Sequence, residues 1–262
     1  MTAARSKIRT VSLLPTQFIL IAVMLASGAC SRKSNDAVRT SAAPRSGMIS
    51  VPGGQFYLGQ EKGGEPGHLV TVKAFETDRT EVTLASYGEC VAAGKCEPGG
   101  STWAACNWPG RSDKPQHPIN CVTWEQANAY CAWNGKRLPT EVEWEFAARG
   151  MDGRMYPWGD AAPDSQTICS NKDRTGTCPA GSSPADKSPL GLLDMAGNVK
   201  EWTSTNEELP GGRKAYVMRG GGWHYDGLTP TMPVRVTERE SLPPSETAAD
   251  VGFRCAADVP GN

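Results

Sequence analysis

The stretch Gly191-Leu-Leu-Asp-Met-Ala-Gly-Asn-Val-Lys-Glu-Trp202 follows neither a helical nor a strand period. Its glycines and its asparagine are typical of turns. The same irregular character extends outward, because no helical pattern is sustained from residue 150 onward. We interpret that half of the chain as turns, tryptophans and short strands. The strand candidates lie at 216–219, 234–236 and 252–255.

Helix signals occur in three places before residue 150. Thr83 can cap a helix that Gly94 ends. Capping boxes of the types Thr-x-x-Gln and Thr-x-x-Glu begin at residues 123 and 140 and predict helices that run to 134 and 149. In the first of these two helices, Cys131 shares a face with other apolar residues and should point inward. Two strands are expected within 48–59 and another at 70–75.

Glycine and proline are in excess. The chain has 29 glycines and 20 prolines among 262 residues, about 19% against roughly 12% in an average protein. The composition excludes a coiled coil and a collagen. With 39% apolar residues and a net charge of −1, the chain can bury a core, and it offers no electrostatic case for a nucleic-acid partner. We expect one coil-rich α+β domain over 48–258 and a short tail at 259–262.

The N-terminus resembles an export signal over residues 1–29. It has a basic start and a run of apolar residues, Phe18 to Ala26, that is too short to span a bilayer. The small residues that follow, with Cys30, resemble the bacterial lipobox, in which this cysteine is acylated. Ser27 stands where that motif usually has leucine, and an ordinary cleaved signal is the alternative. Residues 30–47 would then be a lipidated cysteine and a flexible tether. By resemblance to lipoprotein sorting, Ser31 favours an outer-membrane lipoprotein that faces the periplasm or the cell surface.

Ten short motifs follow one another in order over 48–258. The most distinctive are Gly135-Lys-Arg-Leu-Pro-Thr-Glu-Val-Glu-Trp-Glu145, Gly191–Trp202, Arg219-Gly-Gly-Gly-Trp223 and Gly252-Phe-Arg-Cys255. Together they resemble the formylglycine-generating enzyme family, also called sulfatase-modifying factors. The resemblance implies a C-type-lectin-like α+β fold with little regular secondary structure, which agrees with the excess of glycine and proline.

The resemblance also implies a disulfide between Cys131 and Cys255, which would tie a helix to the last strand. The export signal implies an oxidising compartment, in which the six cysteines closer together in the sequence are expected to pair locally. The expected local pairs are Cys106–Cys121, Cys90–Cys96 and Cys169–Cys178. A zinc site is the alternative, but clustered Cys-x2-Cys pairs are absent. The family's second disulfide has no counterpart, because Ala148 and Arg235 stand at its positions.

A structural calcium ion is a further implication of the resemblance. Asp194 and Glu201 would supply carboxylate oxygens, and Gly197 and Val199 would supply backbone carbonyls. Such hard oxygen ligands suit Ca²⁺. The alternative is a turn with two solvated acids. The candidate ligands of a second calcium site, at about 168–177, are Asn171 and Asp173.

Enzymes of this family oxidise a cysteine of a sulfatase to formylglycine, using O₂ and a copper ion held by two thiolates. In this sequence the two copper positions hold Tyr225 and Pro230, and neither side chain binds Cu(I). Gly222 replaces a serine of the family, and Lys200 replaces a pocket tryptophan. We therefore expect no copper and no oxidase chemistry.

Without the copper ion, the site would still retain a cleft for a ligand. The residues near the family's peptide cleft are Lys200, Arg219, Gly222, Trp223, His224 and Tyr225. Aromatic side chains beside cations suit a protein, peptide or glycan ligand, although Trp223 can equally serve as core packing. The leading hypothesis is an envelope-anchored binding or scaffold module. The competing hypothesis is an active metal-dependent oxidase or sulfatase-modifying enzyme, so enzyme status is left open. The missing cysteine pair separates the two.

Overall fold

The three helices begin at the threonines that were predicted to cap them. They are α1 (Leu84–Ala92), α2 (Trp124–Trp133) and α3 (Glu141–Arg149). The hydroxyl of Thr123 accepts from the backbone N–H of Gln126, and the Gln126 side chain accepts in return from the Thr123 N–H. Thr140 and Glu143 repeat this exchange at α3. Each exchange satisfies donors that have no partner inside the helix, so local chemistry explains where both helices begin.

The computed structural model describes residues 47–59, 67–100, 103–108, 113–164, 167–170, 174–224 and 234–259. Several predictions fall outside these residues: the signal at 1–29, Cys30 with its tether, Asn171 with Asp173, and Tyr225 with Pro230. None of the described helices is long and apolar enough to cross a membrane.

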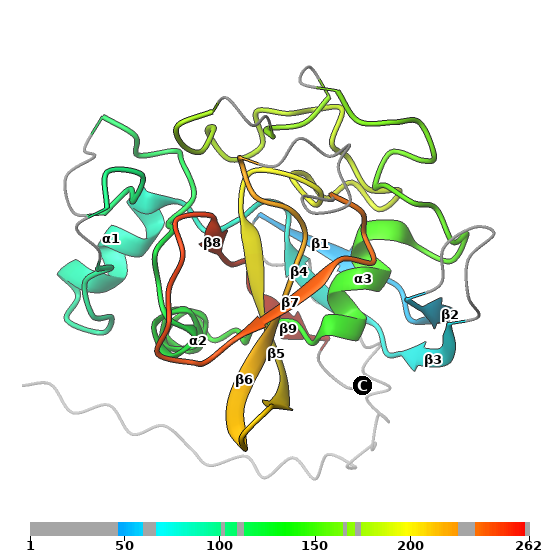
Figure 1. Ribbon diagram of the computed structural model, residues 1–262, viewed down its shortest axis with the longest axis horizontal. Helices are drawn as coiled ribbons and strands as arrows, with labels where there is room; N and C mark the ends of the chain where they lie inside the picture. The colour runs from blue at the N-terminus through cyan, green and yellow to red at the C-terminus, as the bar shows by residue number, and fades with distance from the viewer. Residues whose placement is uncertain are drawn as a thin grey trace, which may run out of the picture. The chain divides into compact units, whose positions relative to one another are not determined.

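Nine strands form three sheets in this described part of the chain. The first sheet has the order β1 (Met48–Val51), β4 (Phe75–Asp78), β9 (Ala256–Asp258), and the second is the hairpin β2 (Gly54–Leu58), β3 (His68–Val72). The third has the order β7 (Arg239–Leu242), β6 (Arg213–Arg219), β5 (Lys200–Leu209), β8 (Val251–Gly252). All pairs are antiparallel except β5–β8. Figure 1 shows the long β5–β6 hairpin near the centre, with α2 and α3 on opposite sides of it.

The second half of the chain departs most from the sequence pattern. The sequence pattern does not predict β5, because Lys200, Glu201 and Thr203 among its first four residues are polar and further polar residues follow, so apolar and polar residues do not alternate. The strand expected at 234–236 is wrong. Val234 and Val236 are fully buried, but the Val236 N–H donates to the loop carbonyl of Met155, at 3.1 Å, instead of joining a ladder. The strand expected at 252–255 is reduced to β8.

The irregular stretch Gly191–Trp202 contributes to all three hydrophobic clusters of the described core. Leu192 and Met195 pack with Trp144 of α3 and with the first sheet. Trp202 packs with α1 and α2 residues. Ala196 joins a third, smaller cluster. This stretch therefore links parts of the core that regular elements do not join.

Four disulfides hold the described domain together, and all four predicted pairings are confirmed. Cys131 of α2 bonds to Cys255 just before β9, with their Cα atoms 5.6 Å apart. Cys131 is fully buried, as its helix face predicted. The three local bonds join Cys90 to Cys96, Cys106 to Cys121 and Cys169 to Cys178. The C-type-lectin-like expectation of a coil-rich, disulfide-bonded α+β domain therefore holds.

Replacing Cys131 and Cys255 together by serine should lower the free energy of unfolding by about 4–5 kcal/mol in the chain-entropy model. The reason is that this bond closes a separation of 124 residues. The matched control is Cys90→Ser with Cys96→Ser, whose separation is 6 residues and whose loss should be about half as large. Urea unfolding followed by tryptophan fluorescence measures both losses. Equal losses in the two double variants would contradict the chain-entropy account.

Candidate functional site

The guanidinium of Arg254 lies at the centre of the loop 191–202. It is buried, and its Nε and Nη2 atoms donate to the two different oxygens of Glu201, each at 2.7 Å. Other donors reach the backbone carbonyls of Arg79, at 3.0 Å, and Leu193, at 2.9 Å. The indole N–H of Trp144 donates to the same Glu201 carboxylate, at 2.7 Å. A bidentate pair with further hydrogen bonds is the arrangement that makes buried charges tolerable.

Three further buried carboxyl groups lie close to this ion pair: those of Glu81, Asp186 and Asp194. Neither oxygen of Glu81 accepts a hydrogen bond from a described residue. Burial and the charge of Asp194 raise the pKa of Glu81 well above its usual range, and they raise the pKa of Asp186 to about 7. Burial also raises the pKa of Asp194. With Glu201, four carboxyl groups face one guanidinium, so the cluster favours retained protons or a bound cation.

The fit of calcium to the loop depends on Glu201. Its Oε2 atom accepts from both Trp144 and Arg254, and its Oε1 atom accepts from Arg254 alone. A carboxylate oxygen accepts about two hydrogen bonds, so one acceptor position is left on Oε1. No group of three or more His, Cys, Asp or Glu side chains within the described ranges is arranged around a common metal position. Calcium with Asp194, Gly197, Val199 and Glu201 as ligands thus remains a prediction that requires carbonyl oxygens as well.

Lys200 belongs to a closed cluster of charges. Its ammonium lies 2.8 Å from the carboxylate of Glu240 and 3.3 Å from that of Asp250. The Nδ1 atom of His224 lies 3.8 Å from the same Asp250 oxygen. Parallel pairing of β5 with β8 brings Asp250 here, because the Lys200 N–H donates to the Asp250 carbonyl at 2.7 Å. No sequence motif marks Glu240 or Asp250, so sequence reasoning missed both.

The remaining predicted cleft residues separate into two groups. Trp223 packs edge-on against His224, and its indole N–H donates to the Ala249 carbonyl at 3.1 Å, so most of this side chain serves the core. The carbonyl of Gly222 accepts from the Ser170 hydroxyl at 2.9 Å. Arg219 differs from the expectation of a cleft residue. Its buried guanidinium points toward α3, where it contacts Glu145 at 3.0 Å and Glu141 at 3.4 Å.

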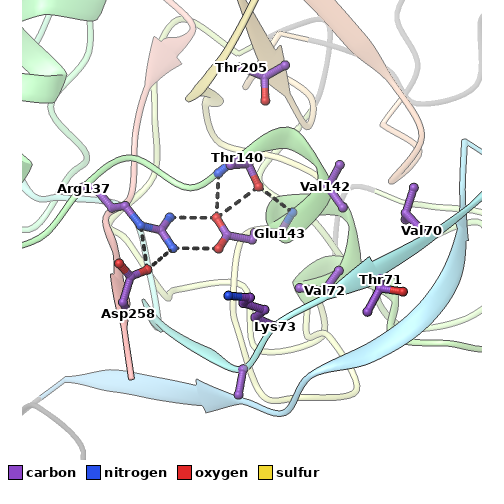
Figure 2. Close-up of a pocket in the computed structure, with 11 residues that line it drawn as sticks. Val70, Thr71, Val72, Lys73, Arg137, Thr140, Val142, Glu143, Thr205 and Asp258 are labelled. Atoms are coloured by element: carbon purple, nitrogen blue, oxygen red, sulfur yellow. Dashed lines mark hydrogen bonds and ion pairs between the residues drawn. The ribbon is translucent and has the colours of Figure 1, made fainter. Parts of the chain in front are cut away.

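A concave surface that the sequence did not single out lies between β3 and the N-terminus of α3 (Figure 2). Its volume is about 680 Å³, within the range of roughly 300–1,000 Å³ that ligand sites occupy. At one end, Arg137 makes two hydrogen bonds of 2.7 Å with Glu143 and a contact of 2.6 Å with Asp258. Arg137 stands in the Gly-Lys-Arg-Leu-Pro motif, which gave no sign of a groove.

Comparison with known proteins agrees with the motifs. The model of the sulfatase-modifying factor enzyme 1-like domain matches residues 33–259. The chain is 33% identical over 266 residues to the inactive C-alpha-formylglycine-generating enzyme 2 of Mus musculus, which covers 81% of this chain and 86% of that protein. It is also 33% identical over 293 residues to the formylglycine-generating enzyme of Streptomyces coelicolor, with 84% and 92% covered.

Solved structures show the same fold. CarF superposes with a TM-score of 0.64 at 25% identity, over 81% of this chain and 98% of CarF. PvdO from Pseudomonas aeruginosa superposes with a TM-score of 0.63 at 26% identity, over 80% and 94%. The motifs, the disulfide between α2 and the C-terminal segment, and these relatives agree. The chain therefore belongs to the formylglycine-generating enzyme, or sulfatase-modifying factor, family.

Proposed function

We propose that this domain is an envelope-anchored binding or scaffold module without the oxidase chemistry of its family. The observation that carries the proposal is the state of the cysteines. All eight cysteines of residues 48–258 are joined in four disulfides. Cu(I) requires soft ligands such as thiolates, and a disulfide sulfur is not a thiolate. The ninth cysteine is Cys30, which we propose to be acylated.

Two further observations support this proposal. Lys200, at the position of a pocket tryptophan in active enzymes of the family, is neutralised by Glu240 and Asp250. The residues at the copper positions, Tyr225 and Pro230, offer Cu(I) no soft ligand. The overall sequence identity does not decide whether the domain has oxidase activity, because the chain is 33% identical both to a relative named inactive and to one named as an enzyme. An active sulfatase-modifying enzyme with another metal site is therefore the second candidate.

We propose that a protein, peptide or glycan ligand binds beside His224, where the resemblance to the family places a peptide cleft. The His224 side chain is 38% exposed, whereas Lys200 and Asp250 behind it are buried. The imidazole can therefore offer its exposed part to a ligand, while its Nδ1 atom lies 3.8 Å from the buried Asp250 carboxylate. We also propose a structural calcium ion at Asp194, Gly197, Val199 and Glu201.

Incubation of the purified protein with Cu(I), O₂ and a peptide containing Cys-x-Pro-x-Arg should yield no aldehyde. Hydrazide labelling and mass spectrometry measure the product, and a peptide with alanine for cysteine provides the background. The matched variant carries Tyr225→Cys and Pro230→Cys, which should bind one Cu(I) in competition with a chromogenic chelator, since it restores two thiols. Aldehyde formation by the unaltered protein would contradict the scaffold proposal and would favour an active sulfatase-modifying enzyme.

Removal of calcium should lower the melting temperature of the protein, because four carboxyl groups near Arg254 then lose a compensating cation. Melting curves with a calcium chelator, and again after Ca²⁺ is restored, measure the shift. Mg²⁺ at the same concentration is the control, because it binds an all-protein oxygen site reluctantly. An unchanged melting temperature would count against calcium at Asp194 and Glu201.

Replacing Cys30 by serine should abolish acylation and release the domain from the membrane fraction. Metabolic labelling with an alkyne-bearing fatty acid, followed by cell fractionation, measures both effects. The matched control is Ser31→Asp, which should remain acylated but move to the inner membrane if lipoprotein sorting applies. Labelling that persists in the Cys30→Ser variant would contradict lipidation at this residue.

A further inference from the structure

The groove of Figure 2 follows the edge of strand β3 and not one of its faces. Its lining includes five consecutive residues, Val70 to Ala74. Successive side chains of an extended chain point to opposite faces, so consecutive residues border one cavity only when the cavity runs along the backbone edge. The opposite wall is formed by Val142 and the first turn of α3. The groove is thus shaped to receive an extended chain.

This edge of β3 has no strand beside it. Among the residues that the structure describes, β3 pairs with β2 alone. In an antiparallel pair, alternate residues turn their N–H and C=O groups away from the partner strand. Over residues 70–73, none of these outward groups bonds to a backbone outside the hairpin within the described chain. An open edge of this kind is a template for an added strand.

The groove has an apolar end and a charged end. Val142, with two valines of β3, packs against the core at the apolar end. At the other end the Lys73 amine lies below Glu143 and points to the side of the groove where Asp258 and Arg137 lie (Figure 2). Arg137 is already paired with two carboxylates, whereas Lys73 makes no hydrogen bond or ion pair with any described residue. The donors of Lys73 therefore complement an acidic group on whatever fills the groove.

The outer face of the same hairpin carries an exposed apolar pair. Tyr57 is 51% exposed and Leu69 is 57% exposed, and they stand directly opposite each other in the β2–β3 register. Gln55 and Thr71, the next pair on this face, hydrogen-bond across the strands at 3.2 Å. A hairpin with exposed apolar side chains beside an open edge favours a protein partner over a small molecule.

From these features we propose that β3 binds an extended segment of a partner protein, which adds as a third strand to the β2–β3 sheet and places an acidic residue on Lys73. Backbone hydrogen bonds hold the segment along the edge. An apolar side chain of the segment enters the space beside Val142. The proposal is independent of the proposed function, because the groove shares no residue with the cleft of Lys200, Trp223 and His224.

The test uses two fluorescein-labelled peptide amides of the sequences Thr-Val-Thr-Val-Glu and Glu-Val-Thr-Val-Thr. They place the acid at opposite ends, so that parallel and antiparallel addition are both sampled. Fluorescence anisotropy with the full-length protein measures binding, and hydrogen exchange measures protection of the amides of residues 70–73. We expect one of the two peptides to bind and to slow that exchange. Its glutamine counterpart should bind about two- to fivefold more weakly, the size typical of an exposed ion pair.

Charge reversal distinguishes recognition from a structural role of the lysine. The variant Lys73→Glu should lose its preference for the glutamate peptide and should prefer the same peptide with lysine in place of glutamate. The matched control is Lys95→Glu, an exposed lysine after α1, which should keep the original preference. Peptides N-methylated at every residue after the first should bind at least roughly tenfold more weakly, because in neither strand register can their internal residues donate to the strand edge.

Three results would overturn the proposal. If neither peptide binds, the remaining role of Lys73 is to prevent the edge of β3 from pairing with the strand of another chain. Equal binding of the N-methylated peptides would show that the groove recognises side chains without strand addition. A dimer in sedimentation experiments that Lys73→Glu dissociates would assign this edge to a second copy of the chain. None of these results bears on the copper assay, so the two proposals fail separately.

Discussion

The buried ion pair between Arg254 and Glu201 is the interaction on which the rest of this structure depends. The guanidinium joins the C-terminal segment to the start of β5 and to carbonyls at the end of β4 and in the loop before residue 194. Breaking a buried pair from one side leaves an unpaired charge in the core, at a cost of about 3–5 kcal/mol. A fold with so little regular structure needs such a centre, because its loops cannot satisfy their carbonyls through ladders.

The small amount of regular secondary structure also explains why the domain contains four disulfide bonds. The disulfide of Cys169 with Cys178 lies beside Asn198, whose side chain accepts from the Cys178 N–H at 2.9 Å, so this bond braces the central loop directly. All eight cysteines of the domain serve such bonds. Three of the bonds close local loops and one joins distant segments, so the cysteines serve the stability of a coil-rich domain.

The ligand site proposed beside His224 and the groove beside β3 differ in their physical basis. Beside His224 the charges are partly compensated, since the Lys200 ammonium lies within ion-pair distance of both the Glu240 and the Asp250 carboxylates. The groove beside β3 has an open backbone edge and an apolar wall. It also contains Lys73, which makes no hydrogen bond or ion pair with any described residue. A site of the first kind would select a ligand by the shape and polarity of its side chains, whereas an open strand edge selects an extended backbone.

The sequence by itself determined the local features and the family. The threonine caps of α1, α2 and α3, the inward direction of Cys131 and the disulfide pairs all follow from short-range patterns or from motif resemblance. Only the tertiary structure decided what depends on contacts between distant segments. The pairing of β5 with β8 brings Asp250 next to Lys200. The Arg219 side chain points toward α3 and not into the expected cleft. Val234 and Val236 are buried, although they form no strand. The physical reason is that burial and charge pairing are properties of the assembled core, and no local period in the sequence encodes which distant partner a side chain will meet.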